Sequence, residues 1–132
     1  MRKFTTNISV IIALSFVAGC KNSALTYPLG APKIDSGFGS YIGVNGGTRI
    51  AAHQGIDIIG NDGQEILAVA DGIVLEATEE RCWGPTIVVD HGKAIDNNKI
   101  IALYGHVGEM LVGEGDPIKR GQLIARLGNN QD

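Results

Sequence analysis

The sequence predicts an all-β fold, a small glycine-rich antiparallel barrel or sandwich preceded by a signal peptide. From residue 34 onward, short apolar runs alternate with turn signals, and no window keeps a helical period for three turns. The 19 glycines stand among plentiful Ile, Val and Leu, which fits tight turns between strands better than disorder. A chain of 132 residues has room for one domain of this kind.

The expected strands follow one another closely, and each ends at a turn. The run GIDII (55–59) ends at GNDG, and the run EILAVA (65–70) ends at Asp71-Gly72. A DG pair between apolar runs is a hairpin signal, so the next run, IVLEAT (73–78), is expected to pair with EILAVA. Three further runs complete the pattern: TIVVDH (86–91), KIIALYGHV (99–107) and EGDPIKRGQLIARLG (114–128). Many short strands with glycine turns favour a barrel or a sandwich.

Residues 1–19 have the layout of a secretory signal. A positive start precedes an apolar run over residues 8–17, and small residues then lead to Cys20. The run is too short to span a bilayer as a helix, and an amphipathic first helix of the fold is the alternative. The phrase VAGC resembles the bacterial lipoprotein cleavage box, which implies a lipid on Cys20 and an anchor in a membrane. By the same resemblance, Lys21 in place of Asp implies the outer membrane, facing the periplasm, in a Gram-negative cell envelope.

The remaining chain divides into a spacer and one domain. Residues 20–33 carry two prolines and no periodicity, so they are expected to link the anchor to a β core over residues 34–132. Without residues 1–19, nine Lys and Arg face fourteen Asp and Glu, a net charge of about minus five. An acidic chain without basic clusters argues against nucleic acid as a partner.

The stretch HQGIDIIG (53–60) places His53 and Asp57 on either side of Gly55. Four residues of extended strand cover roughly 13 Å, too far for both side chains to hold one ion. A glycine between them lets the backbone bend and closes the gap. A histidine nitrogen and a carboxylate oxygen suit zinc, which at a catalytic site usually has three protein ligands. The pattern therefore predicts half of a zinc site or, alternatively, a histidine that only serves a turn.

The order of the neighbouring phrases adds to this motif. They are SGFGSYIG (36–43), AHQGIDI (52–58), GQEILAVADGIV (63–74), GPTIVVDHG (84–92), ALYGHV (102–107) and GDPIKRGQLIARLG (115–128). In this order they resemble the lysostaphin-type, LytM-like zinc metallopeptidases that cut peptide cross-bridges in bacterial peptidoglycan. The resemblance implies a LytM-like β core with a duplicated hybrid motif, a zinc cofactor and metalloendopeptidase activity.

The resemblance also implies a role for individual residues. His53 and Asp57 match the first two zinc ligands, and His106 in YGHV matches a catalytic histidine that stabilises charge or relays a proton. His91 in VDHG stands where the family often has a histidine without metal, so a surface turn is expected there. Tyr104 matches an aromatic residue beside the catalytic histidine, with either a functional or a packing role.

The chain departs from the family pattern after the RLG phrase. The family continues to a His-x-His pair whose second histidine is the third zinc ligand, whereas no histidine follows His106 within the 132 residues. The β core is therefore expected to be incomplete at its C-terminal end, as a piece of a longer enzyme or as a degenerate module. A third possibility is that His91 supplies the missing ligand. The alternative function is a non-catalytic LytM-like lipoprotein that binds peptidoglycan or activates other cell-wall hydrolases.

A second resemblance concerns GDPIKRGQLIARLG, which is also similar to the half-barrel repeat of biotinyl and lipoyl carrier domains. Lys93 is the candidate carrier lysine, but the residues around it match neither carrier signature. Shared β architecture is the expected reason, because a fold does not carry function with it. Cys82 is a lone thiol if Cys20 carries a lipid, and otherwise a Cys20–Cys82 disulfide is open.

Overall fold

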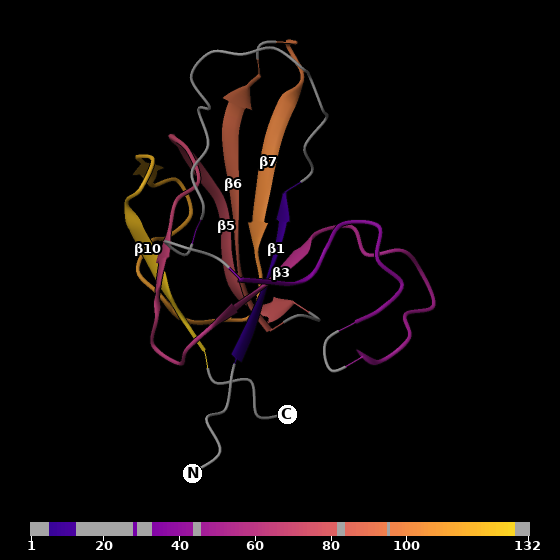
Figure 1. Ribbon diagram of the computed structural model, residues 1–132. Helices are drawn as coiled ribbons and strands as arrows, with labels where there is room; N and C mark the ends of the chain where they lie inside the picture. The colour runs from indigo at the N-terminus through magenta and orange to yellow at the C-terminus, as the bar shows by residue number, and fades with distance from the viewer. Residues whose placement is uncertain are drawn as a thin grey trace.

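The computed structural model describes residues 6–12, 28, 33–43, 46–81, 84–94 and 96–128. Every regular element in these ranges is a β-strand, which confirms the all-β prediction (Figure 1). No helix in the described ranges has the length and apolar character needed to cross a membrane. The strands are β1 (Thr6–Ile12), β2 (Lys33–Ser36), β3 (Ile56–Gly60), β4 (Glu65–Leu67), β5 (Gly72–Arg81), β6 (Gly84–Lys93), β7 (Lys99–Tyr104), β8 (Val107–Met110), β9 (Pro117–Ile118) and β10 (Leu123–Leu127).

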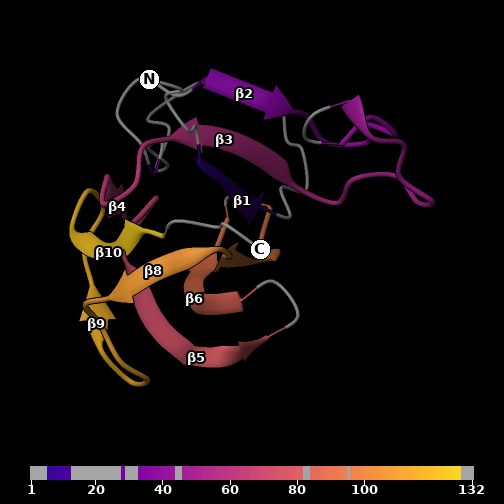
Figure 2. The ribbon, with the colours of Figure 1, turned by 90° about the horizontal axis from the view of Figure 1, so that it is seen from below.

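The strands form two antiparallel sheets. The large sheet has the order β2-β3-β1-β7-β6-β5-β9, and the small sheet has the order β4-β10-β8. Seen from below, β4, β10 and β9 lie along the left side of the molecule, and β2 and β3 lie across its top (Figure 2). This two-sheet arrangement agrees with the predicted antiparallel barrel or sandwich.

The core lies between the two sheets. One cluster of buried hydrophobic side chains contains Ile58, Val74, Ile87, Val89 and Ala102 from the large sheet, and Ile66, Val107, Ile124, Ala125 and Leu127 from the small sheet. Most of these residues are β-branched, a shape that packs well on a pleated surface. Burial of this surface is what holds one sheet against the other.

Strand β1 occupies a central place in the large sheet, between β3 and β7 (Figure 1). It pairs antiparallel with both neighbours, and Val10 lies opposite Ile56 on one side and opposite Tyr104 on the other. Strands β3 and β7 therefore run in the same direction, and the end of β7 lies level with the start of β3. Residues 6–12 lie inside the predicted signal peptide, and in this structure they form a strand of the large sheet.

The predicted hairpin between residues 65–70 and 73–78 is wrong. Strand β4 pairs with β10 in the small sheet, whereas β5 pairs with β6 and β9 in the large sheet. A type I′ turn needs positive φ at both central residues, and neither Asp71 nor Gly72 has it. Instead, the Asp71 carboxylate accepts hydrogen bonds from the Arg120 backbone N–H at 2.8 Å and from Lys119 Nζ at 3.2 Å. The DG pair thus carries the chain from one sheet to the other.

The predicted strand 99–107 also divides between the sheets. Strand β7 ends at Tyr104, β8 begins at Val107, and β8 pairs with β10 in the small sheet. His106 forms the corner with a φ of 59°, a left-handed conformation that few residues other than glycine adopt. A change of sheet at this point places a histidine next to the end of β7.

Candidate functional site

His53 and Asp57 converge, as the spacing around Gly55 predicts. His53 Nε2 lies 3.4 Å from Asp57 Oδ1, and the Asp57 side chain is 1% exposed. Strand β3 begins only at Ile56, so residues 53–55 bend and the pair is closer than an extended strand would allow. Ile58 belongs to the core, and alternation along the strand turns Asp57 towards the opposite face. The carboxylate is therefore buried outside the hydrophobic core.

The orientation of the His53 ring is set by its other nitrogen. Nδ1 lies 3.2 Å from the Gly37 carbonyl oxygen and 3.4 Å from Ser36 Oγ. Ser36 Oγ donates its own hydrogen to the Ile42 carbonyl oxygen at 2.8 Å, so both neighbours of Nδ1 act as acceptors. Nδ1 therefore carries a hydrogen directed at these acceptors, and Nε2 is the ring nitrogen that faces Asp57. A backbone carbonyl holding the second ring nitrogen is also how metal-binding histidines are usually oriented.

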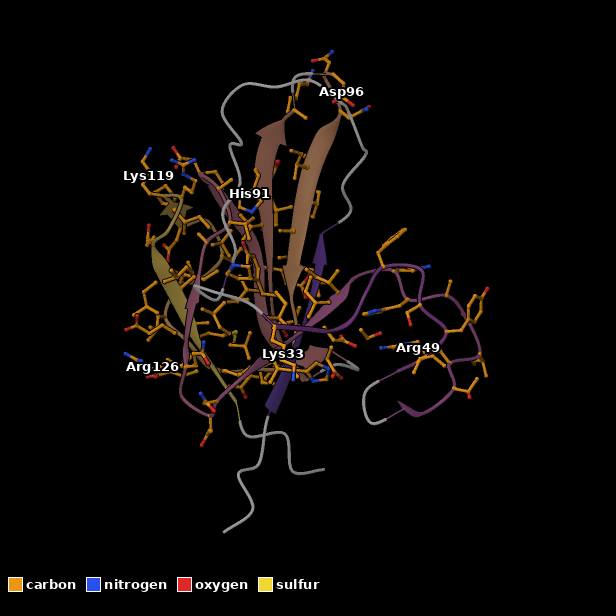
Figure 3. The ribbon with its side chains drawn as sticks, viewed as in Figure 1. Lys33, Arg49, His91, Asp96, Lys119 and Arg126 are labelled. Atoms are coloured by element: carbon orange, nitrogen blue, oxygen red, sulfur yellow. The ribbon has the colours of Figure 1, made fainter. Side chains whose placement is uncertain are left out.

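Arg49 supplies a positive charge to this pair. Its Nη2 donates a hydrogen bond to Asp57 Oδ2 at 2.6 Å, a short charge-assisted contact. Arg49 belongs to the segment 37–52, whose described residues, 37–43 and 46–52, project to one side of the sheets (Figure 3). Sequence reasoning missed this residue, because an arginine eight positions before an aspartate has no spacing signature of its own.

His106 joins the site from the end of β7. Tyr104, the last residue of β7, lies level with Ile56 across β1, and His106 follows two residues later. Burial lowers the pKa of His106, and the nearby Asp57 carboxylate offsets part of that effect. The structure thus places His53 in contact with Asp57, and it places His106 close enough for the charge of Asp57 to act on it.

The donors present test the expectation of a zinc ion. An imidazole and a carboxylate are suitable ligands, but a catalytic zinc normally has three from the protein. Within the described part of the chain, no three His, Cys, Asp or Glu side chains are grouped so that they could hold a metal ion. Asp57 Oδ2 is moreover already in contact with a guanidinium. In this conformation, the described residues do not fit a three-ligand zinc site.

The other candidates lie apart from this group. His91 is in β6, where its Nδ1 lies 2.8 Å from the Asp71 carbonyl oxygen, and Figure 3 shows it far from Arg49. His91 therefore does not supply the third ligand in this structure. The Tyr104 hydroxyl accepts a hydrogen bond from the Val69 backbone N–H at 3.0 Å in the core, which is the packing role. Lys93 is exposed at the end of β6, while Cys20 and Cys82 lie outside the described residues.

Comparison with known proteins gives a family for the chain. The model of peptidase family M23 matches residues 51–132, well over half of the sequence. The murein hydrolase activator NlpD of Escherichia coli (strain K12) is 38% identical over 84 residues, which are 63% of this chain and 21% of that protein. The lipoprotein NlpD/LppB homolog of Pseudomonas aeruginosa is 37% identical over 78 residues, covering 58% of this chain and 25% of that protein.

A further relative, the murein hydrolase activator EnvC of Escherichia coli (strain K12), is 35% identical over 77 residues, covering 58% of this chain and 17% of that protein. The chain spans about a fifth of the length of the curated relatives it matches. The matched segment contains His53, Asp57 and His106, and it confirms the LytM-like resemblance inferred from the order of the phrases. On the extent of this match, the chain belongs to peptidase family M23.

Proposed function

We propose that this chain acts in the bacterial cell envelope as a LytM-type module that activates cell-wall hydrolases and does not itself cleave peptidoglycan. The observation that carries the proposal is the ion pair between Arg49 and Asp57, which engages the one carboxylate assigned to metal binding. The names of the relatives support the same direction, since NlpD and EnvC are both called murein hydrolase activators.

An exposed apolar surface supports a protein partner. The segment 37–52 carries four large apolar side chains that face solvent: Phe38, Tyr41, Ile42 and Ile50. Phe38 is 73% exposed and Ile50 is fully exposed, in the same segment as Arg49. Gathered apolar side chains on a surface mark sites that other proteins cover. A hydrolase that docks on this segment would lie directly beside the candidate site.

The proposed location is the outer membrane, facing the periplasm, with a lipid anchor on Cys20. The relatives called lipoproteins support this location, as does the VAGC phrase of this chain. An anchored module would act on peptidoglycan, or on the enzymes bound to it, within reach of the spacer over residues 20–33.

A second candidate is a zinc endopeptidase that cleaves peptidoglycan cross-bridge peptides. The presence of His53, Asp57 and His106 together in the chain favours it, because a module that never catalysed this reaction has no chemical need for all three. In that function His53 and Asp57 would hold the metal, and His106 would stabilise charge beside it. Arg49 would then have to leave Asp57.

One assay separates the two functions. Dye-labelled peptidoglycan is incubated with the chain alone, with a purified cell-wall hydrolase alone, and with both. We expect no release of dye by the chain alone, and faster release by the hydrolase when the chain is added. Release by the chain alone, lost in an Asp57→Asn variant, would establish the endopeptidase instead.

The docking surface has its own variant and control. Replacing both Phe38 and Ile50 by Ser should abolish the gain in hydrolase activity, because the apolar contact is lost while both positions are exposed. Leu111→Ser, an equally polar change at an exposed leucine outside the segment 37–52, should keep the gain. Equal activation by both variants would exclude the segment as the docking surface.

A further inference from the structure

Asp57 is almost fully buried and has a cation in contact with it. Arg49 Nη2 lies 2.6 Å from Asp57 Oδ2, and the Asp57 side chain is 1% exposed. A buried carboxylate is costly unless a positive charge or several donors accompany it. The other carboxylate oxygen, Oδ1, faces His53 Nε2 at 3.4 Å. The guanidinium of Arg49 thus stands at the carboxylate, next to an imidazole.

The imidazole lies at the other oxygen of the same carboxylate. His53 Nδ1 is held by the Gly37 carbonyl oxygen at 3.2 Å, and Nε2 faces Asp57 Oδ1. The guanidinium of Arg49 and the imidazole of His53 therefore share one buried carboxylate, with Arg49 in the shorter contact.

The guanidinium is held in place by its segment but is incompletely bonded. The Arg49 backbone N–H donates to the Tyr41 carbonyl oxygen at 2.9 Å, and the His53 N–H donates to the Ser40 carbonyl oxygen at 2.9 Å. These bonds fix the segment on both sides of Arg49. The Nε atom of Arg49, however, is buried with no hydrogen-bond partner. Arg49 therefore provides a positive charge for Asp57, while one of its own N–H donors lacks an acceptor. Because an unmade hydrogen bond weakens the hold of Arg49 on the site, another cation is able to displace it.

We propose that Arg49 takes the place of a metal ion at this site, and that it competes with a divalent cation for the Asp57 carboxylate. The ligand class is a borderline cation such as Zn²⁺, because the donors left when Arg49 withdraws are imidazole and carboxylate. Arg49 then adds to the mismatch with a three-ligand zinc site, because it engages one of the two donors that a metal would use. This inference goes beyond activation of hydrolases and stands whether or not the chain activates one.

Titration of Zn²⁺ into the full chain, followed by calorimetry, tests the competition. Arg49→Met keeps an unbranched apolar stem and removes the charge, so it should bind Zn²⁺ about tenfold more tightly than the unmodified chain, a usual size for coupling between two ligands. Zn²⁺ should also raise the Tm of Arg49→Met more than that of the unmodified chain. Arg126→Met removes an arginine from exposed ion pairs with Glu65 and Glu109, and it should behave as the unmodified chain.

Two further variants make the result decisive. Arg49→Met combined with Asp57→Asn should lose the gain, because the carboxylate is the group under competition. Arg49→Lys keeps a positive charge beside Asp57 and serves as the second variant if Arg49→Met proves unstable. It should still show a gain, because lysine lacks the planar fork, but a smaller one than Arg49→Met, because the charge remains. Equal Zn²⁺ affinity in the unmodified chain and in both Arg49 variants would overturn the proposal. A gain that survives Asp57→Asn would overturn it as well.

Discussion

At Asp57, an arginine contributes the positive charge that a buried carboxylate requires. The sequence predicted that His53 and Asp57 converge, since their spacing around a glycine is a local property of the backbone. It did not predict Arg49, because this contact depends on where the segment that carries Arg49 lies relative to the start of β3. The donors of a site were thus predictable from short spacing, whereas the group that occupies the site was not.

Tyr104 shows how one residue of the matched motif serves packing. Its hydroxyl accepts a hydrogen bond from the Val69 N–H in the core, and burial raises the pKa of Tyr104, so the buried hydroxyl stays neutral. Tyr104→Phe should destabilise the protein by about 1–3 kcal/mol, because it leaves the Val69 N–H buried without an acceptor. Urea denaturation measures the change.

The matched control is Tyr41→Phe, which removes the same hydroxyl from a side chain that is 58% exposed. Its effect should stay within about 0.5 kcal/mol, as for most surface substitutions. Equal losses for the two variants would mean that the Tyr104 hydroxyl has no special role in the core.

At the scale of elements, apolar runs and turn residues predicted where the strands are but not which strands pair. Strands β3, β5, β6 and β10 lie where the runs indicate. The errors occur at Asp71-Gly72 and at Gly105-His106, where the chain changes sheets. A change of sheet leaves no mark in apolar periodicity, since the strands on both sides remain apolar. It depends on non-local bonds such as that from the Arg120 N–H to Asp71.

The contact between β8 and the end of β10 depends on two glycines. A Cβ added at Gly108 would lie 2.5 Å from the Gly128 Cα and 2.9 Å from the Gly128 backbone nitrogen. Gly108→Ala should therefore cost about 1–3 kcal/mol of unfolding free energy, because backbone atoms must move apart. Gly113→Ala is the control, since its Cβ would meet only Asp116 Oδ2 at 3.9 Å. Thermal denaturation that ranks the two variants equally would contradict the close approach.

Asp71 at the crossing from β4 to β5 predicts a dependence of stability on pH. The Arg120 backbone N–H and then the Lys119 side chain hold the pKa of Asp71 below its usual value of 3.8. A carboxylate with a lowered pKa in the folded state contributes stability that is complete above the unfolded value and is lost as the pH falls through the folded value. Asp71→Asn should therefore reduce the slope of unfolding free energy against pH below 3.8.

The control for this slope is Asp62→Asn, which makes the same change of charge in the exposed turn after β3. We expect Asp62→Asn to leave the slope closer to that of the unmodified chain. The account of the crossing fails if the Asp71 variant loses stability in acid as steeply as the unmodified chain does.

At the scale of the whole molecule, β1 is a strand of the large sheet that lies within the predicted signal peptide. If residues 1–19 are removed as the sequence predicts, β3 and β7 lose the strand between them, and their backbone groups there lose partners. Hydrogen exchange at the backbone amides of residues 56–60 and 102–104 should then be faster in a chain that begins at Cys20 than in the full chain. Residues 86–89, between β5 and β7, should be less affected.

Equal exchange in β3 and β7 of the two forms would contradict a structural role for β1. Such a result would mean that these strands keep their protection without residues 6–12. The comparison separates a segment that only directs export from one that also completes the sheet.

The central claim is that a guanidinium, and not a metal ion, accompanies Asp57 in the resting protein. The most direct measurement is the zinc content of the purified chain. It is determined by elemental mass spectrometry after the chain has been exposed to excess Zn²⁺ and dialysed. The account predicts zinc at background for the unmodified chain and clearly more for Arg49→Met. One zinc per molecule in the unmodified chain, lost in Asp57→Asn, would contradict it.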